Sequence, residues 1–242
     1  IIRWYAAIEK DLTVTLSGDN VELSEKVYNA IKGNSKLTVK FTGGALTIPA
    51  TAKEDALALV ATTSDNIIKI AGKQSLTYTT ATTLAYEIEV GANAALTISA
   101  GTGAKATTVQ DITNKGTLTI AAGDVKTASG KTITNTNALT IAANATLTAK
   151  VLNNADSNNG MYTQNAVITN NGMLNLQADS ENQCTINNNN KLDVQGETTN
   201  KKVAAVQNGT NGYTAVINNL DATKSYICLL YTSPSPRDYA AS

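Results

Sequence analysis

Short runs in which every second residue is aliphatic recur along the chain, separated by polar turns. Leu46–Ile48, Leu118–Ile120 and Leu139–Ile141 all have the sequence Leu-Thr-Ile. Residues two apart point to the same side of a β-strand, so the two aliphatic side chains share one side and the threonine lies on the other. The intervening segments are rich in asparagine and glycine, which favour tight turns. The pattern predicts many short strands, each with one buried side.

These strands belong to a repeated unit that occurs four times. In each unit an apolar residue is followed two positions later by asparagine, and then by aliphatic residues at the seventh and ninth positions. The copies are Ile112–Ala122, Ile133–Ala143, Ile168–Ala178 and a degenerate Ile186–Val194, at successive offsets of 21, 35 and 18 residues. One unit is too short to bury its own aliphatic residues, so we expect the units to stack and form a continuous core.

Stacked short strands with a shared core predict an all-β parallel solenoid. A propeller is disfavoured because its blades need longer repeats with aromatic signatures. An antiparallel sandwich stays open as an alternative, because Asn171-Gly172 and Asn208-Gly209 are hairpin signals. The predicted core consists of the recurring aliphatic positions of three units: Ile112, Leu118, Ile120, Ile133, Leu139, Ile141, Ile168, Leu174 and Leu176.

The first fifty residues carry a helical pattern. Ser24 is a candidate N-cap and Gly33 a candidate stop. The apolar side of this predicted short helix is formed by Val27, Tyr28 and Ile31. A second segment, Thr51–Ala61, fits either a helix or a loop. We expect the helix to form a cap that covers the open end of the stack.

The chain is expected to have three parts: 1–50 as the cap and first strands, 51–227 as solenoid repeats, and Cys228–Ser242 as a non-native tail. The run Cys228–Asp238, CLLYTSPSPRD, resembles the translation of a transposase adapter used to prepare sequencing libraries. A tail of this kind is excluded from fold reasoning. The chain also begins at Ile1 rather than at methionine, so we expect it to be a piece of a longer protein.

The composition excludes several kinds of chemistry. The chain contains no histidine, which rules out Ser-His-Asp triads, Cys-His dyads and histidine-rich metal sites within it. Lys and Arg together number 19, as do Asp and Glu, and the basic residues are scattered. A nucleic-acid partner is not expected, because a phosphate-binding surface needs clustered basic residues. We expect no cofactor, since no phosphate-binding loop motif occurs, and no membrane span, since no apolar run approaches 18 residues.

Two groups of polar residues are candidates for a site. Asp179 and Glu181 form the best local carboxylate pair, with Asp193 as a third member, and two carboxylates are the machinery of glycoside hydrolysis. Their place in a turn is more typical of solvated acidic residues. The second group is the asparagine of each unit: Asn114, Asn135, Asn170 and Asn188. We predict that stacked coils align these four in one ladder of amide hydrogen bonds, with a glycan-binding row as the alternative.

Other polar and reactive side chains have structural interpretations. Cys184 begins an apolar strand and is interpreted as a small buried hydrophobe. Thr119 and Thr140 are interpreted as β-favouring surface residues, since the unequal offsets argue against a regular ligand-binding row. Tyrosines in the second half could stack on sugar rings or join an interface, although partial burial is the commoner role: Tyr162, Tyr213 and Tyr226.

Through its I-T-N-x-G-x-L-x-I cadence, Ile112–Val194 resembles the passenger regions of autotransporters and related repeat-rich bacterial surface adhesins. The resemblance implies a right-handed parallel β-helix at the bacterial cell surface or outside the cell, and transfers no catalytic residue. We therefore expect a non-enzymatic secreted or cell-surface structural or adhesive rod, with host glycans or surface proteins as partners. The alternative is a polysaccharide lyase or hydrolase, or a carbohydrate-binding module, on the same fold. A groove flanked by clustered Asp, Glu and Lys would favour that alternative, and a smooth surface of Thr and Asn would favour adhesion.

Overall fold

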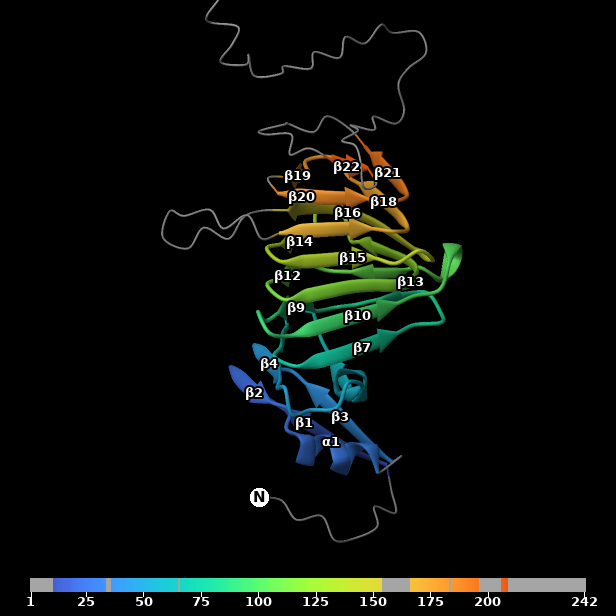
Figure 1. Cartoon of the computed structure of the whole chain (residues 1–242). Helices are drawn as coiled ribbons and strands as arrows, with labels where there is room; N and C mark the ends of the chain where they lie inside the picture. The colour runs from blue at the N-terminus through green and yellow to red at the C-terminus, as the bar shows by residue number, and fades with distance from the viewer. Residues whose placement is uncertain are drawn as a thin grey trace, which may run out of the picture.

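The computed structural model describes residues 11–33, 36–64, 66–153, 166–182, 184–195 and 206–208. Within these ranges the chain winds into about eight stacked coils of parallel strands (Figure 1). The coils are right-handed, which is the hand that parallel crossover connections almost always take. The prediction of an all-β parallel solenoid is confirmed, and the paired strands run parallel rather than antiparallel as a sandwich would require.

Three faces make up most of each coil. The first face contains β2 (Asn20–Glu22), β4 (Ala45–Ile48), β6 (Ile67–Ile70), β9 (Glu87–Val90), β12 (Ile112–Asn114), β14 (Thr132–Asn135), the second half of β16 (Ala145–Asn153) and β19 (Glu181–Asn182). The second face contains β7 (Lys73–Thr77), β10 (Ala95–Ser99), the first half of β13 (Thr117–Thr127), β15 (Ala138–Ile141), β17 (Val167–Asn170), β20 (Thr185–Asn188) and β22 (Val206–Asn208). The third face contains β8 (Thr82–Thr83), β11 (Thr107–Val109), the second half of β13, the first half of β16, β18 (Met173–Leu176) and β21 (Lys191–Val194).

The core is a set of aliphatic columns that run along the axis. On the second face, Leu96, Leu118, Leu139, Ile168 and Ile186 lie in register, one above the other, and all are buried. Fully burying one such side chain contributes about 1.5–3 kcal/mol relative to leaving it exposed. All nine core residues predicted from the repeat are buried. Because every coil buries its aliphatic residues against the coil on either side, the core is continuous along the stack.

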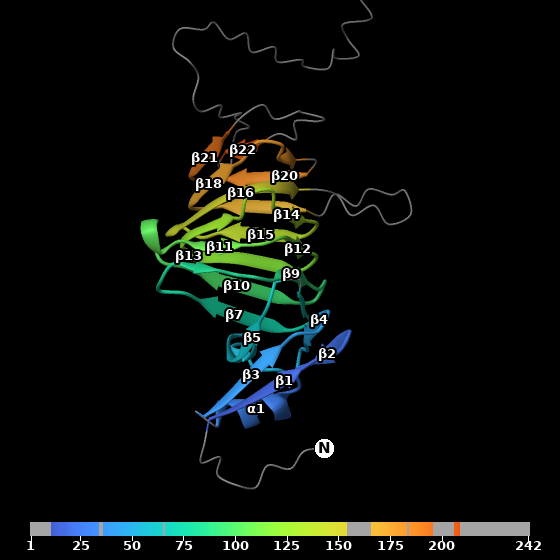
Figure 2. The same cartoon turned by 180° about the vertical axis from the view of Figure 1, so that it is seen from behind.

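A separate three-stranded parallel sheet begins the stack. This N-terminal sheet contains β1 (Leu12–Leu16), β3 (Leu37–Phe41) and β5 (Val60–Thr62). Its strands directly precede strands of the first face, as third-face strands do in later coils. Parallel pairing therefore begins at Leu12, so the first fifty residues already follow the same winding (Figure 2).

A short helix and a 3-10 turn occupy the places where second-face strands would stand in the first two coils. The helix α1 (Glu25–Lys32) starts at Ser24, whose side chain accepts a hydrogen bond from the Val27 N–H, and it ends before Gly33. The helix, its cap and its stop are confirmed. Tyr28 and Ile31 are buried, whereas Val27 is 37% exposed. The main neighbours of α1 in the described residues are η1 and β3, and the helix buries Tyr28 and Ile31 more fully than Val27.

The open edge of the second face is covered by the segment before β5. Thr51–Ala61 had been expected to form either a helix or a loop. It forms mainly a loop that contains the short 3-10 helix η1 (Ala56–Leu59) and ends in the first residues of β5. The Ser75 N–H of β7 donates to the Glu54 carbonyl at 2.7 Å. The buried Gln74 side chain accepts from the Leu57 N–H at 3.1 Å and donates to the Lys53 carbonyl at 2.7 Å. These bonds satisfy edge groups that would otherwise be free to pair with another chain.

Candidate functional site

The three predicted carboxylates do not form one cluster. Asp179 is exposed in the turn between β18 and β19, with a φ of 62°, and Glu181 follows on the first face. Asp193 lies on the third face one coil further along the stack, in register with Asn175. Among the described residues none of the three carboxylates has a salt bridge. Asp193 therefore lies on the coil that follows the Asp179–Glu181 turn, and within the described ranges the three carboxylates form no group that could hold a metal ion.

The asparagines form hydrogen-bonded ladders inside the corners of the coil. Along the corner after the first face, Asn114 Nδ2 donates to Asn135 Oδ1 at 2.7 Å, and Asn135 Nδ2 donates to Asn153 Oδ1 at 2.7 Å. Asn153 Nδ2 continues the ladder to Asn182 Oδ1 at 2.6 Å. Each amide also donates to a backbone carbonyl, as Asn114 does to Ala138 at 2.8 Å. The first three amides are at most 1% exposed, so the ladder lies out of reach of a ligand.

The other two predicted asparagines form a second ladder at a different corner. Asn170 Nδ2 donates to Asn188 Oδ1 at 2.7 Å, after strands of the second face. Asn170 is in register with Ile141 of β15 and not with Asn135. The expectation of one column of four is therefore corrected to two ladders. The physical reason is that Val151-Leu152-Asn153 already occupies the coil above Ile133–Asn135, so the third copy of the unit starts one face later.

An ion cluster that the sequence reasoning missed lies at the start of first-face strands. Lys131 Nζ donates to Asp111 Oδ2 at 2.8 Å and to Glu87 Oε1 at 3.1 Å, and so links three successive coils. The Thr132 N–H donates to Asp111 Oδ1 at 2.7 Å. A second ion pair joins β9 to the end of β12: Lys115 Nζ lies 3.0 Å from Glu89 Oε1. The only sequence signal was a spacing of about one coil between Glu87, Asp111 and Lys131, which lie just outside the repeated unit.

The electrostatics of this ion cluster suit cross-coil bonding better than acid–base catalysis. Burial alone would raise the pKa of Asp111, but the hydrogen bonds from Lys131 and from the Thr132 N–H outweigh it and hold that pKa below its usual value. Hydrogen bonds to Asp111 and Glu87 raise the pKa of Lys131. A general acid needs a raised carboxyl pKa and a lysine base needs a lowered one. Both shifts run the opposite way.

From β10 to β20, the outward side of the second face carries small, uncharged side chains. Thr97, Thr119, Thr140 and Thr169 lie in register on successive coils, with Asn187 above them. From β10 to β20 the other outward positions of this face are also uncharged: Ala95, Ser99, Thr117, Ala121, Ala138, Val167 and Thr185. The unequal offsets had argued against a regular row, but the turns absorb the extra residues and leave the strands in register. Neighbouring threonines in this row lie on adjacent coils, about 4.8 Å apart, which is the spacing of hydrogen-bonded strands.

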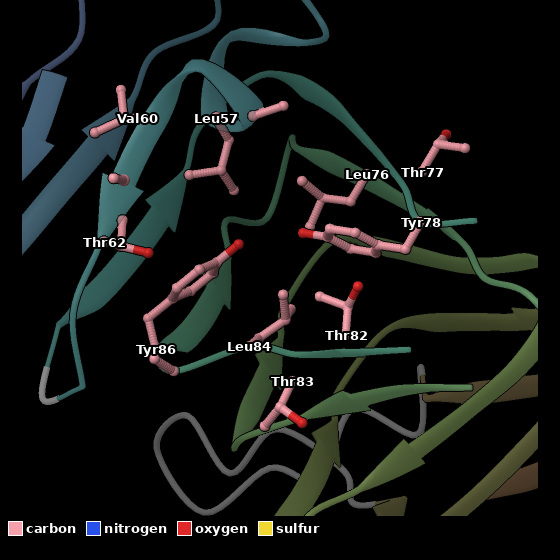
Figure 3. A pocket seen from close by; sticks show the side chains of 13 residues that line it. Leu57, Val60, Thr62, Leu76, Thr77, Tyr78, Thr82, Thr83, Leu84 and Tyr86 are labelled. Carbon is pink, nitrogen blue, oxygen red and sulfur yellow. The ribbon is translucent and has the colours of Figure 1, made fainter. Parts of the chain in front are cut away.

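A pocket lies between the N-terminal sheet and the third face. Its cavity is about 270 Å³. Two tyrosines and four aliphatic residues supply much of its lining (Figure 3): Tyr78, Tyr86, Leu57, Val60, Leu76 and Leu84. The predicted tyrosine candidates Tyr162, Tyr213 and Tyr226 lie outside the described residues, as does the adapter-like tail.

Comparison of the chain with known protein families, with curated proteins and with solved structures found no match. Within the described ranges no group of three or more Cys, Asp and Glu side chains is arranged to hold a metal ion. In the same ranges, no helix combines the length and apolar character needed to cross a membrane. The chain is therefore a β-solenoid with a short N-terminal helix. Any activity has to be inferred from its surfaces.

Proposed function

We propose that this chain is part of a non-enzymatic structural or adhesive rod, secreted or displayed at a bacterial cell surface, which contacts glycans or surface proteins. The observation that carries the proposal is the part of the second face from β10 to β20, which is uncharged on its outward side and carries a row of threonines from Thr97 to Thr169. The first and third faces carry outward charges over the same coils, among them Glu89, Lys150 and Lys126.

An uncharged face of small side chains has the properties of an adhesive surface. Its hydroxyl groups give and accept hydrogen bonds, and its methyl groups pack without the desolvation cost that a charged side chain carries. Short threonine and alanine side chains also lose little rotamer freedom on contact. Many weak contacts along a rod add together when both partners are presented repeatedly on surfaces.

The enzymatic alternative would use the carboxylates and lysine of the ion cluster, Glu87, Asp111 and Lys131. Hydrogen bonds hold the pKa of Asp111 below its usual value, the opposite of what a general acid needs, and the pocket does not include any of the three residues. The adhesive proposal is therefore the better supported of the two.

Beads coated with the full chain provide the test. We would measure their detachment force on surfaces carrying a mucin, the same mucin after removal of its glycans, and albumin. The variant Thr140→Glu puts a charge on the second face, and Thr134→Glu is its matched control on the first face of the same coil. We expect adhesion to the mucin or its protein core that Thr140→Glu lowers at least fivefold and Thr134→Glu preserves.

Two results would overturn the proposal. One is detachment from all mucin surfaces at the force seen with albumin. The other is release of sugar fragments from a panel of polysaccharides by the full chain, which would establish the enzymatic alternative.

A further inference from the structure

A break in strand pairing creates the pocket at the N-terminal end of the stack. In order along the chain, β5 of the N-terminal sheet and β8 of the third face should be neighbours on successive coils. Instead, among the described strands, β5 pairs only with β3 and β8 pairs only with β11. The Thr82 and Leu84 N–H groups both donate toward β11, to Ala106 and Thr108. The wall of the solenoid is therefore open between β5 and β8.

The cavity in this opening has an apolar floor and a hydroxyl-bearing rim. Figure 3 shows the Tyr78 and Tyr86 rings pointing their hydroxyl groups toward one another across it, with Leu57, Leu76 and Leu84 beside them. Further hydroxyl groups in the lining come from four threonines: Thr62, Thr77, Thr82 and Thr83. None of the thirteen lining residues carries a charge. A ligand that matches this lining is itself neutral and combines C–H surface with several hydroxyl groups.

Each of the two phenols can offer its hydroxyl hydrogen to such a ligand. Burial raises the pKa of both Tyr78 and Tyr86, so both stay protonated at neutral pH. A phenol that accepts one hydrogen bond still has its own hydrogen to donate. The Tyr78 hydroxyl hydrogen can therefore bond to a ligand oxygen, while the aromatic faces offer surface to C–H groups.

We propose that the pocket between β5 and β8 binds one neutral pyranose ring, with a 6-deoxyhexose as the best match. A cavity of about 150 Å³ holds benzene, with six heavy atoms, so in proportion 270 Å³ accommodates about eleven. A 6-deoxyhexose has that many atoms. Its methyl group suits the leucines, and its hydroxyl groups suit Tyr78 and the threonines. The inference goes beyond the adhesive role, because no residue of the threonine row from Thr97 to Thr169 lines the pocket.

Ligand-observed NMR on the full chain tests the proposal. The probes are the methyl glycosides of a 6-deoxyhexose, of the corresponding hexose and of a uronic acid, each titrated to 50 mM. We expect saturable binding near 1 mM for the 6-deoxyhexose, a value ordinary for about twelve heavy atoms. The hexose should bind less tightly, and the uronic acid at least tenfold less tightly, since the lining offers no cation.

Three variants connect the signal to this pocket. Tyr78→Phe keeps the ring but removes the spare donor, and should weaken binding about tenfold, the value of one good hydrogen bond. Ala61→Phe fills the rim from an exposed position, so it blocks the pocket without disturbing the core. The matched control is Tyr28→Phe, which removes a hydroxyl that bonds Asp55 outside the pocket.

The outcomes separate cleanly. Loss of binding in Tyr78→Phe and Ala61→Phe with retention in Tyr28→Phe supports the proposal. No binding of any pyranose at 50 mM, equal binding of the uronic acid, or equal binding by all three variants overturns it. Binding of phenol with no binding of sugars also overturns it, and identifies an apolar cavity instead.

Discussion

The asparagine ladder after the first face predicts a large, pH-dependent loss of stability when its second member, Asn135, is replaced. Asn135 accepts a hydrogen bond from Asn114 and donates to Asn153 Oδ1 at 2.7 Å and to the Asn137 carbonyl at 3.0 Å. It is fully buried. Asn135→Ala removes three hydrogen bonds, each contributing about 1 kcal/mol net, and leaves the Asn153 oxygen without a donor. We expect the free energy of unfolding to fall by about 3–5 kcal/mol.

Asn135→Asp keeps the shape and tests the direction of the hydrogen bonds. An ionised carboxyl at this site would turn acceptors toward the Asn153 oxygen and the Asn137 carbonyl, so the folded state favours the protonated form and raises the pKa of the new carboxyl. The unfolded chain ionises it above about pH 4. The Asn135→Asp variant is therefore most stable, relative to the wild type, below pH 4. Above that its free energy of unfolding falls by about 1.4 kcal/mol per pH unit, until the pKa of the new carboxyl in the folded state is reached.

Urea unfolding of the full chain, followed by circular dichroism between pH 3.5 and 8, measures both effects. Asn137→Asp is the matched control, since its side chain lies half-buried in the same turn, outside the ladder, and donates to the Lys115 carbonyl at 3.2 Å. The control should follow the wild type at every pH. Equal midpoints for Asn135→Ala and Asn137→Ala, or a pH-independent difference between Asn135→Asp and wild type, would refute the ladder as a source of stability.

Three further predictions concern other parts of the stack. Gly116→Ala and Gly172→Ala should each lower the free energy of unfolding by about 1–3 kcal/mol, because a Cβ at either position would overlap backbone carbonyl oxygens of the preceding coil or turn. The control Gly33→Ala should be nearly neutral, since its Cβ would meet only an ordinary contact. Equal urea midpoints for the three variants would contradict this prediction. Burial tends to raise the pKa of Asp111, but hydrogen bonds from Lys131 and Thr132 hold it low, so its ionised form stabilises the fold above about pH 4 and that contribution is lost on acidification. Asp111→Asn should thus lower the urea midpoint at pH 7 and flatten its fall between pH 4 and 2, and an unchanged acid profile would count against the ion cluster. Burial raises the pKa of the Cys184 thiol, so its alkylation at pH 7.5, followed by peptide mass spectrometry, should be at least tenfold slower in the native chain than in urea; comparable rates would mean that the thiol is accessible.

The sequence was sufficient for the strands, the core and the helix, because those depend on short-range periodicity. Leu118, Ile133 and Ile168 could be assigned to the core from alternation with period two, without knowing which face each occupies. The assignment to faces could not be made, because the third unit begins one full coil and one face after the second. A weak signal was present: Val151-Leu152-Asn153 has the same apolar-x-Asn spacing as the unit, without its other residues.

The candidate sites were harder to predict because they depend on which coils meet. Glu87, Asp111 and Lys131 come from three coils whose spacing is set by turns of different length, and no local motif connects them. Tyr78 and Tyr86 face the same cavity only because β5 and β8 fail to pair. The carboxylates Asp179 and Glu181 looked promising because they were close in sequence, but proximity along the chain gives no third partner from another face.

The shift of the repeated unit from one corner to the next has a consequence for how such a chain can lengthen. The same nine positions fit the corner after the first face in two copies and the corner after the second face in two others. Corners are thus interchangeable, and a duplication or deletion need not equal a whole coil to leave the aliphatic columns intact. Growth by thirds of a turn would change which side of the rod each outward residue occupies, so surface properties could be reassorted around an unchanged core.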